Sequence, residues 1–221
     1  MKLSVFNGSP RGKKSNTRIL LEKVIEGFST ITNTETRVIY LNNLAERKNA
    51  HQAFADSDLT ILGFPLYTDS MPGLVKEFIE SLAPYVNRSN NPKIAFLVQS
   101  GFPESLHSRF VEKYLEKLAG RLNTPYAGTI VKGGCEPIQL MSEKSNQKLF
   151  NGLHEMGADL AQKGAFDPVK LKNLSKPERY PRILAPVFKL ALLLPISQYY
   201  WNYQLKENGA YEARFSRPFK D

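Results

Sequence analysis

The chain has 221 residues, of which 42% are hydrophobic, and its formal net charge is +9. This length suits one domain with an appendage. The positive charge argues against a small acidic electron carrier and favours anionic ligands, which include phosphorylated cofactors, nucleic acid and anionic membrane surfaces.

The lone cysteine, Cys135, excludes an internal disulfide framework and any metal site built only of cysteine. The first residues lead directly into a strand pattern and not into a secretion signal. The longest apolar run, around residues 190–196, is well short of the ~20 residues that span a bilayer. We therefore expect a cytoplasmic protein without stable membrane insertion.

Strand and helix patterns alternate along residues 1–163. Apolar runs predict strands at 2–7, 35–41, 59–65, 93–98 and 126–131. Helical spacing predicts helices at 17–28, 72–83, 104–122 and 147–163, with a loop and a short helix in 42–54. The fifth strand reads as a shorter edge strand. This alternation predicts an α/β protein whose parallel sheet has helices on both faces. Of the common doubly wound orders, the five-stranded order 2-1-3-4-5 fits best.

Residues 164–221 exceed this domain. Pro168, Pro177 and Pro181 predict an extended basic connector over 167–182. An apolar stretch at 185–196 and an aromatic one at 198–205 follow, and Asn208-Gly209 ends a predicted helix. The extension can pack on its own domain, form a dimer interface or lie on a membrane surface. We favour the first two, because prolines break the short apolar run.

The loop after the first strand has the composition of a phosphate site. Gly8 and Gly12 permit a tight turn, and Arg11 offers a charged fork. Small donors come from Ser9, Ser15, Asn16 and Thr17, and a helix N-terminus follows them. The spacing matches neither the Walker loop nor the dinucleotide fingerprint. The alternative is an ordinary polar turn with a helix cap at Ser15 or Asn16.

Two further loops, 65–73 and 99–103, end at the same edge of the predicted sheet. Both combine proline or small residues with an aromatic side chain, Tyr67 in one and Phe102 in the other. Each aromatic taken alone reads as a cap on the core. Together with the first loop, they predict a site for a planar phosphorylated cofactor.

These motifs resemble the NAD(P)H-dependent FMN reductase family of the flavodoxin-like superfamily. The resemblance rests on Gly8-Ser9-Pro10-Arg11, Ser15-Asn16-Thr17, Pro65-Leu66-Tyr67 and the stretch from Met71 to Lys76, and it covers about residues 1–163. It implies a flavodoxin-like domain over 1–163, noncovalent FMN, NADPH or NADH as cosubstrate, and a homodimer acting on small molecules and not on nucleic acid. Acceptors in the family include quinones, flavins, azo and nitro compounds.

The resemblance also assigns roles to residues. Ser9, Arg11, Ser15, Asn16 and Thr17 would hold the FMN phosphate. Pro65, Leu66, Tyr67, Thr68 and Met71 would line one side of the isoalloxazine, and Ser100, Gly101 and Phe102 would approach its other edge. No catalytic side chain is expected, because hydride transfer to a flavin requires no acid–base residue.

The chain departs from some relatives in two places. Residues 42–58 contain no cysteine, which excludes the iron–sulfur cluster that some relatives carry there. The first loop looks one residue longer than the commonest form, which leaves Lys13 and Lys14 either near the phosphate or simply solvated. His51, His107 and His154 show no metal-binding spacing. The alternatives are a flavodoxin-type electron carrier without nicotinamide activity and a phosphate-binding protein that takes no flavin.

Overall fold

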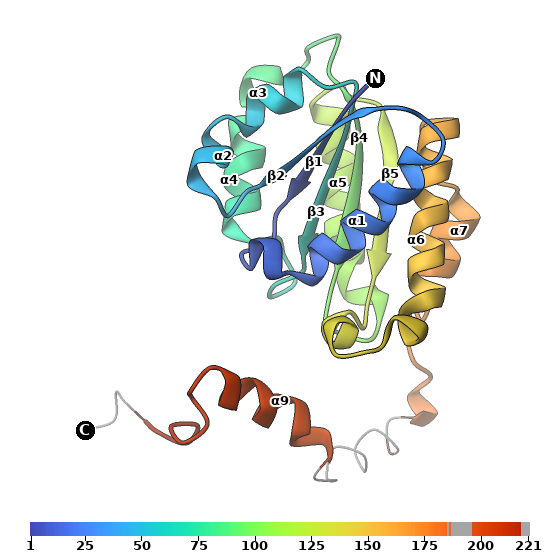
Figure 1. Cartoon of the computed structure of the whole chain (residues 1–221). Helices are drawn as coiled ribbons and strands as arrows, with labels where there is room; N and C mark the ends of the chain where they lie inside the picture. The colour runs from blue at the N-terminus through green and yellow to red at the C-terminus, as the bar shows by residue number, and fades with distance from the viewer. Residues whose placement is uncertain (185, 187–195, 218–221) are drawn as a thin grey trace. The chain divides into compact units, whose positions relative to one another are not determined.

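The computed structural model describes residues 1–184, 186 and 196–217 (Figure 1). The chain divides into two compact units, Met1–Arg179 and Tyr180–Asp221. The first unit contains a five-stranded parallel sheet in the order β2-β1-β3-β4-β5. The strands are β1 (Lys2–Asn7), β2 (Glu35–Tyr40), β3 (Leu59–Pro65), β4 (Lys93–Gln99) and β5 (Tyr126–Lys132). The predicted flavodoxin-like fold and strand order are therefore confirmed.

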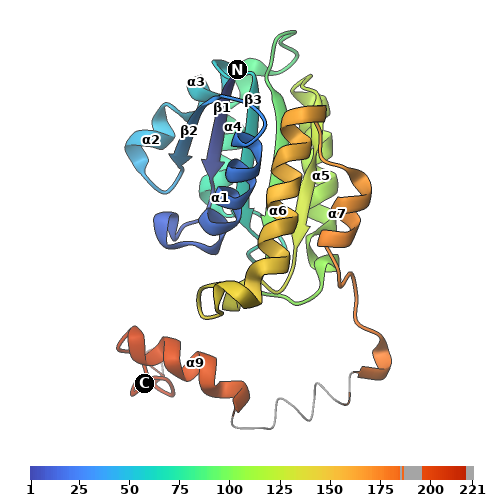
Figure 2. The ribbon, with the colours of Figure 1, turned by 45° about the vertical axis from the view of Figure 1, so that its right-hand side comes forward.

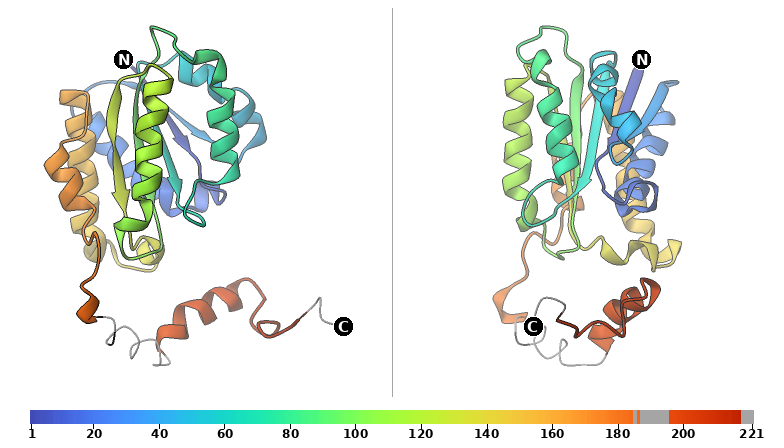
Figure 3. Two further views of the ribbon diagram at one scale, coloured as in Figure 1. Left: turned by 180° about the vertical axis from the view of Figure 1, so that it is seen from behind. Right: turned by 90° about the vertical axis from the view of Figure 1, so that its left-hand side faces the viewer.

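Helices cover both faces of the sheet (Figures 2 and 3). The longer ones are α1 (Asn16–Ser29), α4 (Gly73–Ser81), α5 (Arg109–Arg121) and α6 (Glu143–Lys163), and the shorter ones are α2 (Leu44–Lys48), α3 (Ala50–Ala55) and α7 (Pro168–Leu174). One core joins the sheet to α3, α4 and α5, and a second joins it to α1, α6 and α7. Alternating strand residues feed the two cores: Ile61 enters the second and Leu62 the first.

Helices α1 and α6 pack closely because glycine lies at their contact. A Cβ on Gly157 of α6 would lie 2.0 Å from the Val24 carbonyl oxygen of α1. A Cβ on Gly27 of α1 would lie 1.8 Å from the His154 carbonyl oxygen of α6. The two backbones therefore approach more closely than any side chain would allow. This contact fixes α1, whose first turn forms part of the candidate site.

The structure corrects the expected environment of Phe110. We expected it to share an apolar face with Val111, but its side chain is 79% exposed. The buried stripe of α5 runs through Val111, Leu115 and Leu118, and Phe110 lies about 100° away from it around the helix. The expected helix at 104–122 is also divided, because η3 (Ser105–Ser108) is a 3₁₀ turn and α5 follows it.

Two further expectations differ from the structure. β5 has seven residues, like β3 and β4, and is not shortened. The segment expected as an extended connector contains α7, which Pro168 begins and the Asp167 side chain caps. Beyond α7, Arg109 on α5 forms hydrogen bonds of 2.9 and 3.1 Å to the Glu178 carboxylate. This pair ties residues 175–178 to the helix that follows the β4 loop.

The second unit contains α9 (Ile196–Glu207), and Gly209 with a φ of +64° follows it. The helix therefore ends beside Asn208-Gly209, as predicted. Tyr199 and Trp201 are exposed on it. Most of the predicted apolar stretch at 185–196 lies outside the described residues. Within the described part of the chain, no helix has the length and apolar character needed to cross a membrane.

Candidate functional site

The loop between β1 and α1 is a compact turn held by its own polar groups. The Ser9 amide donates to Asn7 Oδ1 at 2.9 Å, and the Arg11 amide donates to Ser9 Oγ at 3.3 Å. Gly12 has a φ of +51°, which suits glycine, and a Cβ there would collide with the Asn42 side chain. The loop backbone is therefore fixed before any ligand arrives.

Helix α1 begins in this loop with Ser15 as its N-cap. Ser15 Oγ donates to the Gly12 carbonyl at 2.6 Å and accepts from the Arg18 amide at 3.2 Å. The amides of Asn16 and Thr17 occupy the first turn, where no intrahelical acceptor is available. Ser9, Ser15, Asn16 and Thr17 are all buried. The loop thus combines a buried polar wall with amide donors at the positive end of a helix.

Asn16 and Thr17 also connect this loop to other strand ends. Asn16 Nδ2 donates to the Cys135 carbonyl at 2.7 Å, and Gln139 Nε2 donates to Asn16 Oδ1 at 2.6 Å. Gln99 Nε2 donates to Thr17 Oγ1 at 3.4 Å. The start of α1 is therefore braced by the end of β4 and by the loop that follows β5.

The loop after β3 contains a tight turn. Tyr67 and Ser70 exchange backbone hydrogen bonds of 2.9 and 3.0 Å across Thr68 and Asp69. These two central residues have φ values of +49° and +58°, a left-handed conformation that is costly for a β-branched threonine. The turn leaves the Tyr67 side chain 45% exposed beside the other loops.

The loop after β4 presents a second aromatic side chain. The Phe102 ring stacks on the His107 ring with centroids 4.5 Å apart, and Phe102 is 46% exposed. Its carbonyl accepts from the Gly134 amide at 2.7 Å, and the Cys135 amide donates to the Ser100 carbonyl at 2.9 Å. The β4 and β5 loops are thus hydrogen-bonded to one another.

All these loops meet at one small pocket of about 40 Å³. Of the predicted site residues, its walls contain Ser9, Arg11, Ser15, Asn16, Pro65, Leu66, Tyr67, Ser100 and Gly101. Thr17, Thr68, Met71 and Phe102 belong to the same loops but do not line this pocket. Its volume is far below that of a whole flavin.

Two pocket residues were not predicted, Gln99 and Glu136. Gln99 is the last residue of β4, and its side chain reaches α1. Glu136 lies in the loop after β5, and its Oε1 is 3.8 Å from Arg11 Nη1. The doubly wound strand order points to the loops after strands one, three and four, but the carboxyl end of β5 lies at the same sheet edge. The polar stretch directly after the fifth strand was therefore the sequence signal that pointed to Glu136 as a pocket residue.

The one cysteine next to this site is not a nucleophile. Cys135 is fully buried, and burial raises the pKa of its thiol to about 12. The thiol therefore stays protonated at neutral pH, and it donates to the Lys132 carbonyl at 3.5 Å within the core.

A family model described as NADPH-dependent FMN reductase matches residues 1–131. The chain therefore belongs to the NADPH-dependent FMN reductase family. It is accordingly an NAD(P)H-dependent flavin oxidoreductase with FMN as its cofactor. A comparison with curated protein sequences gives no significant match.

Several solved structures share the fold of this chain. An NAD(P)H:quinone oxidoreductase from Methanothermobacter marburgensis is 14% identical with a TM-score of 0.58, over 72% of this chain and 96% of that one. An NADH:FMN oxidoreductase in its apo form is 18% identical with a TM-score of 0.57, over 80% and 96%. An FMN-dependent NADH-azoreductase from Bacillus anthracis, in complex with FMN, is 12% identical with a TM-score of 0.56, over 73% and 99%. At these identities the likeness concerns the fold.

Proposed function

We propose that this protein oxidises NADPH or NADH by hydride transfer to FMN and passes the electrons to a small acceptor of the quinone, flavin, azo or nitro class. The proposal is carried by one observation. The β1, β3 and β4 loops converge on a single polar pocket at the carboxyl edge of the sheet. When bound, FMN supplies the redox chemistry, and the residues described here bind and orient it.

The first loop suits a phosphate by the chemistry of its donors. Ser9 Oγ accepts a hydrogen bond from the Arg11 amide, so its hydroxyl proton stays available to a ligand in the pocket. Thr17 Oγ1 accepts from Gln99, but Thr17 is fully buried and does not line the pocket, so we assign it a positioning role. Arg11 adds a guanidinium that is half exposed. The side chains of Ser15 and Asn16 are engaged in bracing α1, so we assign them a positioning role, with the Asn16 amide contributing a donor.

The second and third loops suit the flat part of the cofactor. We propose that Pro65, Leu66, Tyr67, Thr68 and Met71 flank one side of the isoalloxazine and that Ser100, Gly101 and Phe102 approach its other edge. The left-handed turn at Thr68-Asp69 holds Tyr67 in place, and the stack on His107 holds Phe102. Both aromatic side chains remain partly exposed. This exposure is needed if a nicotinamide or an acceptor is to stack against them.

We further propose a homodimer in the cytoplasm. Leu106, Phe110 and Tyr114 form an exposed apolar stripe on η3 and α5, the elements that directly follow the loop of Phe102. A second copy that covers this stripe would also cover one side of the proposed flavin site. The extension at 164–221 is a further contributor to assembly, either on its own domain or on the partner.

Sedimentation velocity tests the dimer. Phe110→Asp should shift the protein toward monomer, and Val169→Asp provides the matched control, because Val169 is 69% exposed on α7. Removal of residues 183–221 should disturb assembly or solubility. Equal sedimentation of both aspartate variants and the parent would contradict the proposed stripe, and a soluble, dimeric and fully active truncated protein would contradict the role of the extension.

A steady-state assay tests the proposed reaction. The purified protein is saturated with FMN, and oxidation of NADPH and NADH is followed with a quinone, an azo dye, a nitroaromatic compound and free flavin as acceptors. We expect turnover with one or more of them that depends on bound FMN. A protein that stays colourless when FMN is added would instead indicate a phosphate site for another ligand.

A further inference from the structure

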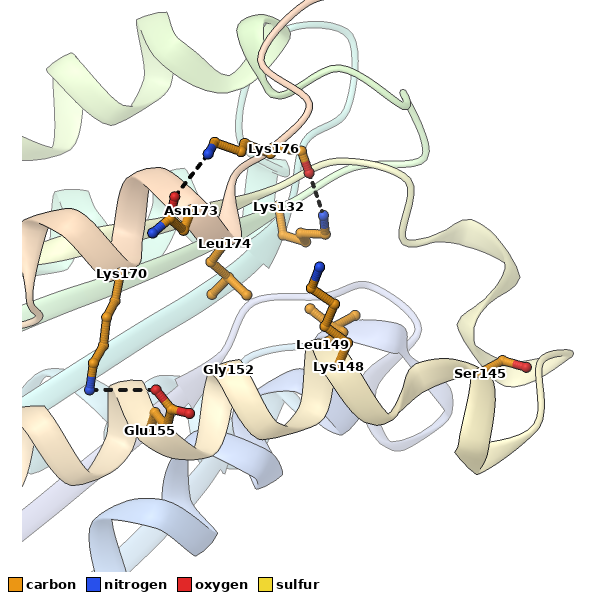
Figure 4. Close-up of a pocket in the computed structure, with 10 residues that line it drawn as sticks. All are labelled: Lys132, Ser145, Lys148, Leu149, Gly152, Glu155, Lys170, Asn173, Leu174 and Lys176. Atoms are coloured by element: carbon orange, nitrogen blue, oxygen red, sulfur yellow. Dashed lines mark hydrogen bonds and ion pairs between the residues drawn. The ribbon is translucent and has the colours of Figure 1, made fainter.

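A separate pocket lies between α6 and α7, next to the end of β5 (Figure 4). Its volume is about 500 Å³, within the usual range for small-molecule sites. Its lining includes Lys132, Lys148, Leu149, Glu155, Lys170 and Leu174. None of these residues lines the pocket between the three loops. The cavity is therefore distinct from the proposed flavin site.

One end of this pocket carries positive charge that the protein does not neutralise. Lys132 projects from the end of β5 and Lys148 from α6, and their ammonium groups point toward the same space (Figure 4). Lys132 Nζ donates to the Lys176 carbonyl at 2.9 Å. Among the described residues, no carboxylate lies within ion-pair distance of Lys132 or Lys148.

The opposite end is neutralised internally. Lys170 Nζ lies 3.6 Å from Glu155 Oε2 and 2.8 Å from Asp159 Oδ2. The side chains of Leu149 and Leu174 add apolar surface to the lining, with Leu149 beside Lys148 (Figure 4). The pocket thus offers unpaired positive charge at one end and apolar surface beside it.

The two facing ammonium groups repel one another. Burial is the main reason that the pKa of Lys132 lies below its ordinary value, and the charge of Lys148 lowers it further. An anion between the two would remove this repulsion. Lysine binds phosphate well as a point charge, and two ammonium groups match the two charges of a phosphate monoester.

We propose that this pocket binds a phosphorylated small molecule. Its phosphate lies between Lys132 and Lys148, and its apolar part lies against Leu149 and Leu174. The proposal does not depend on flavin chemistry, because the two pockets share no residue.

Calorimetric titration of the FMN-saturated protein with inorganic phosphate, phenyl phosphate, benzoate and phenol tests the proposal. Saturating FMN keeps added phosphate away from the first loop. We expect phenyl phosphate to bind more tightly than inorganic phosphate, and benzoate and phenol to bind weakly. Lys148→Met should weaken phenyl phosphate binding by about 10-fold, the cost of one charged hydrogen bond. Lys132→Met should weaken phenyl phosphate binding to a similar extent. Lys148 is exposed, so Lys148→Met is not expected to disturb folding, and its effect reports on binding alone.

Lys144→Met and Lys172→Met are the matched controls, since both lysines are exposed on α6 and α7 and neither lines the pocket. These two variants should bind phenyl phosphate with a dissociation constant within about twofold of the parent's. FMN absorbance and the melting temperature confirm that each variant is folded. Absence of saturable binding, or equal weakening by Lys148→Met and Lys144→Met, would overturn the proposal. Equal binding of phosphate and phenyl phosphate would refute the apolar part, and equal binding of benzoate would refute the preference for phosphate.

Discussion

Arg11 Nη1 lies 3.8 Å from Glu136 Oε1, across the pocket where the loops after β1, β3 and β4 meet. Both side chains are about half exposed, so this ion pair adds little to stability. Its importance is local, because Arg11 and Glu136 both line this pocket. A ligand phosphate would therefore compete with Glu136 for Arg11.

Arg11→Ala should weaken FMN binding without unfolding the protein. Loss of one charged hydrogen-bond donor costs about 1.5–3 kcal/mol, which corresponds to ~10–100-fold in the dissociation constant. Fluorescence titration of the apoprotein with FMN measures the change. Arg11→Lys keeps the charge but loses the fork and should have a smaller effect. Unchanged affinity in Arg11→Ala would show that the loop does not bind the phosphate.

Glu136→Gln should act in the opposite direction. Removing the competing carboxylate is expected to strengthen FMN binding by about 1.5–5-fold, the range of an exposed ion pair. The gain should decrease as salt is added, because salt screens the Arg11–Glu136 attraction. The same titration at low and high ionic strength measures both effects. Weaker binding in Glu136→Gln would mean that the carboxylate supports the cofactor and does not compete with it.

Gly157→Ala should destabilise the first unit by about 1–3 kcal/mol, because its Cβ would strike the Val24 carbonyl oxygen and push α1 from α6. For a chain of this size, each kcal/mol lowers the melting temperature by about 2–4 °C. The matched control is Gly120→Ala on α5, where nothing lies within 4 Å. That variant should gain about 0.4–1 kcal/mol. Similar melting temperatures for the two variants would contradict the observed helix contact.

The Arg109–Glu178 pair should make stability depend on pH. The hydrogen bond from Arg109 lowers the pKa of Glu178 below its ordinary value of 4.5. The stabilisation is therefore present above pH ~4.5 and is lost as the pH falls through the pKa of the folded state. Glu178→Gln should be less stable than the parent at neutral pH by about 0.5–1 kcal/mol.

Urea unfolding at several pH values measures this difference, with Glu116→Gln as an exposed control. The stability gap between Glu178→Gln and the parent should shrink as the pH falls from about 4.5 through the lower pKa that Glu178 has in the folded protein. A gap that persists in acid would show that Glu178 contributes through packing and not through its charge.

Much of the fold could be predicted because its signals are local. The unbroken apolar run at Leu59–Pro65 marked a strand covered on both faces, and the N-cap of α1 at Ser15 was one of two expected positions. Phe110 was misplaced because it is adjacent in sequence to Val111 but lies on another side of the helix. α7 was missed because proline was taken to break a helix that it begins.

The site residues that could be predicted are those that lie together in short sequence motifs. Glu136 could not be found in this way, because its relation to Arg11 depends on how the loop after β5 folds back onto α1 through Asn16. The pocket between α6 and α7 likewise depends on β5, α6 and α7, which are separated in the sequence. Such clusters require the register of the sheet and the packing of the helices, which no single stretch of sequence contains.

Anaerobic addition of NADPH to the FMN-saturated protein, followed by its visible spectrum, examines the proposed activity without any acceptor. We predict that the absorption band of oxidised flavin is bleached and returns when an acceptor is admitted. A flavin band that is unchanged by NADPH and by NADH would contradict the reductase function and favour an electron carrier.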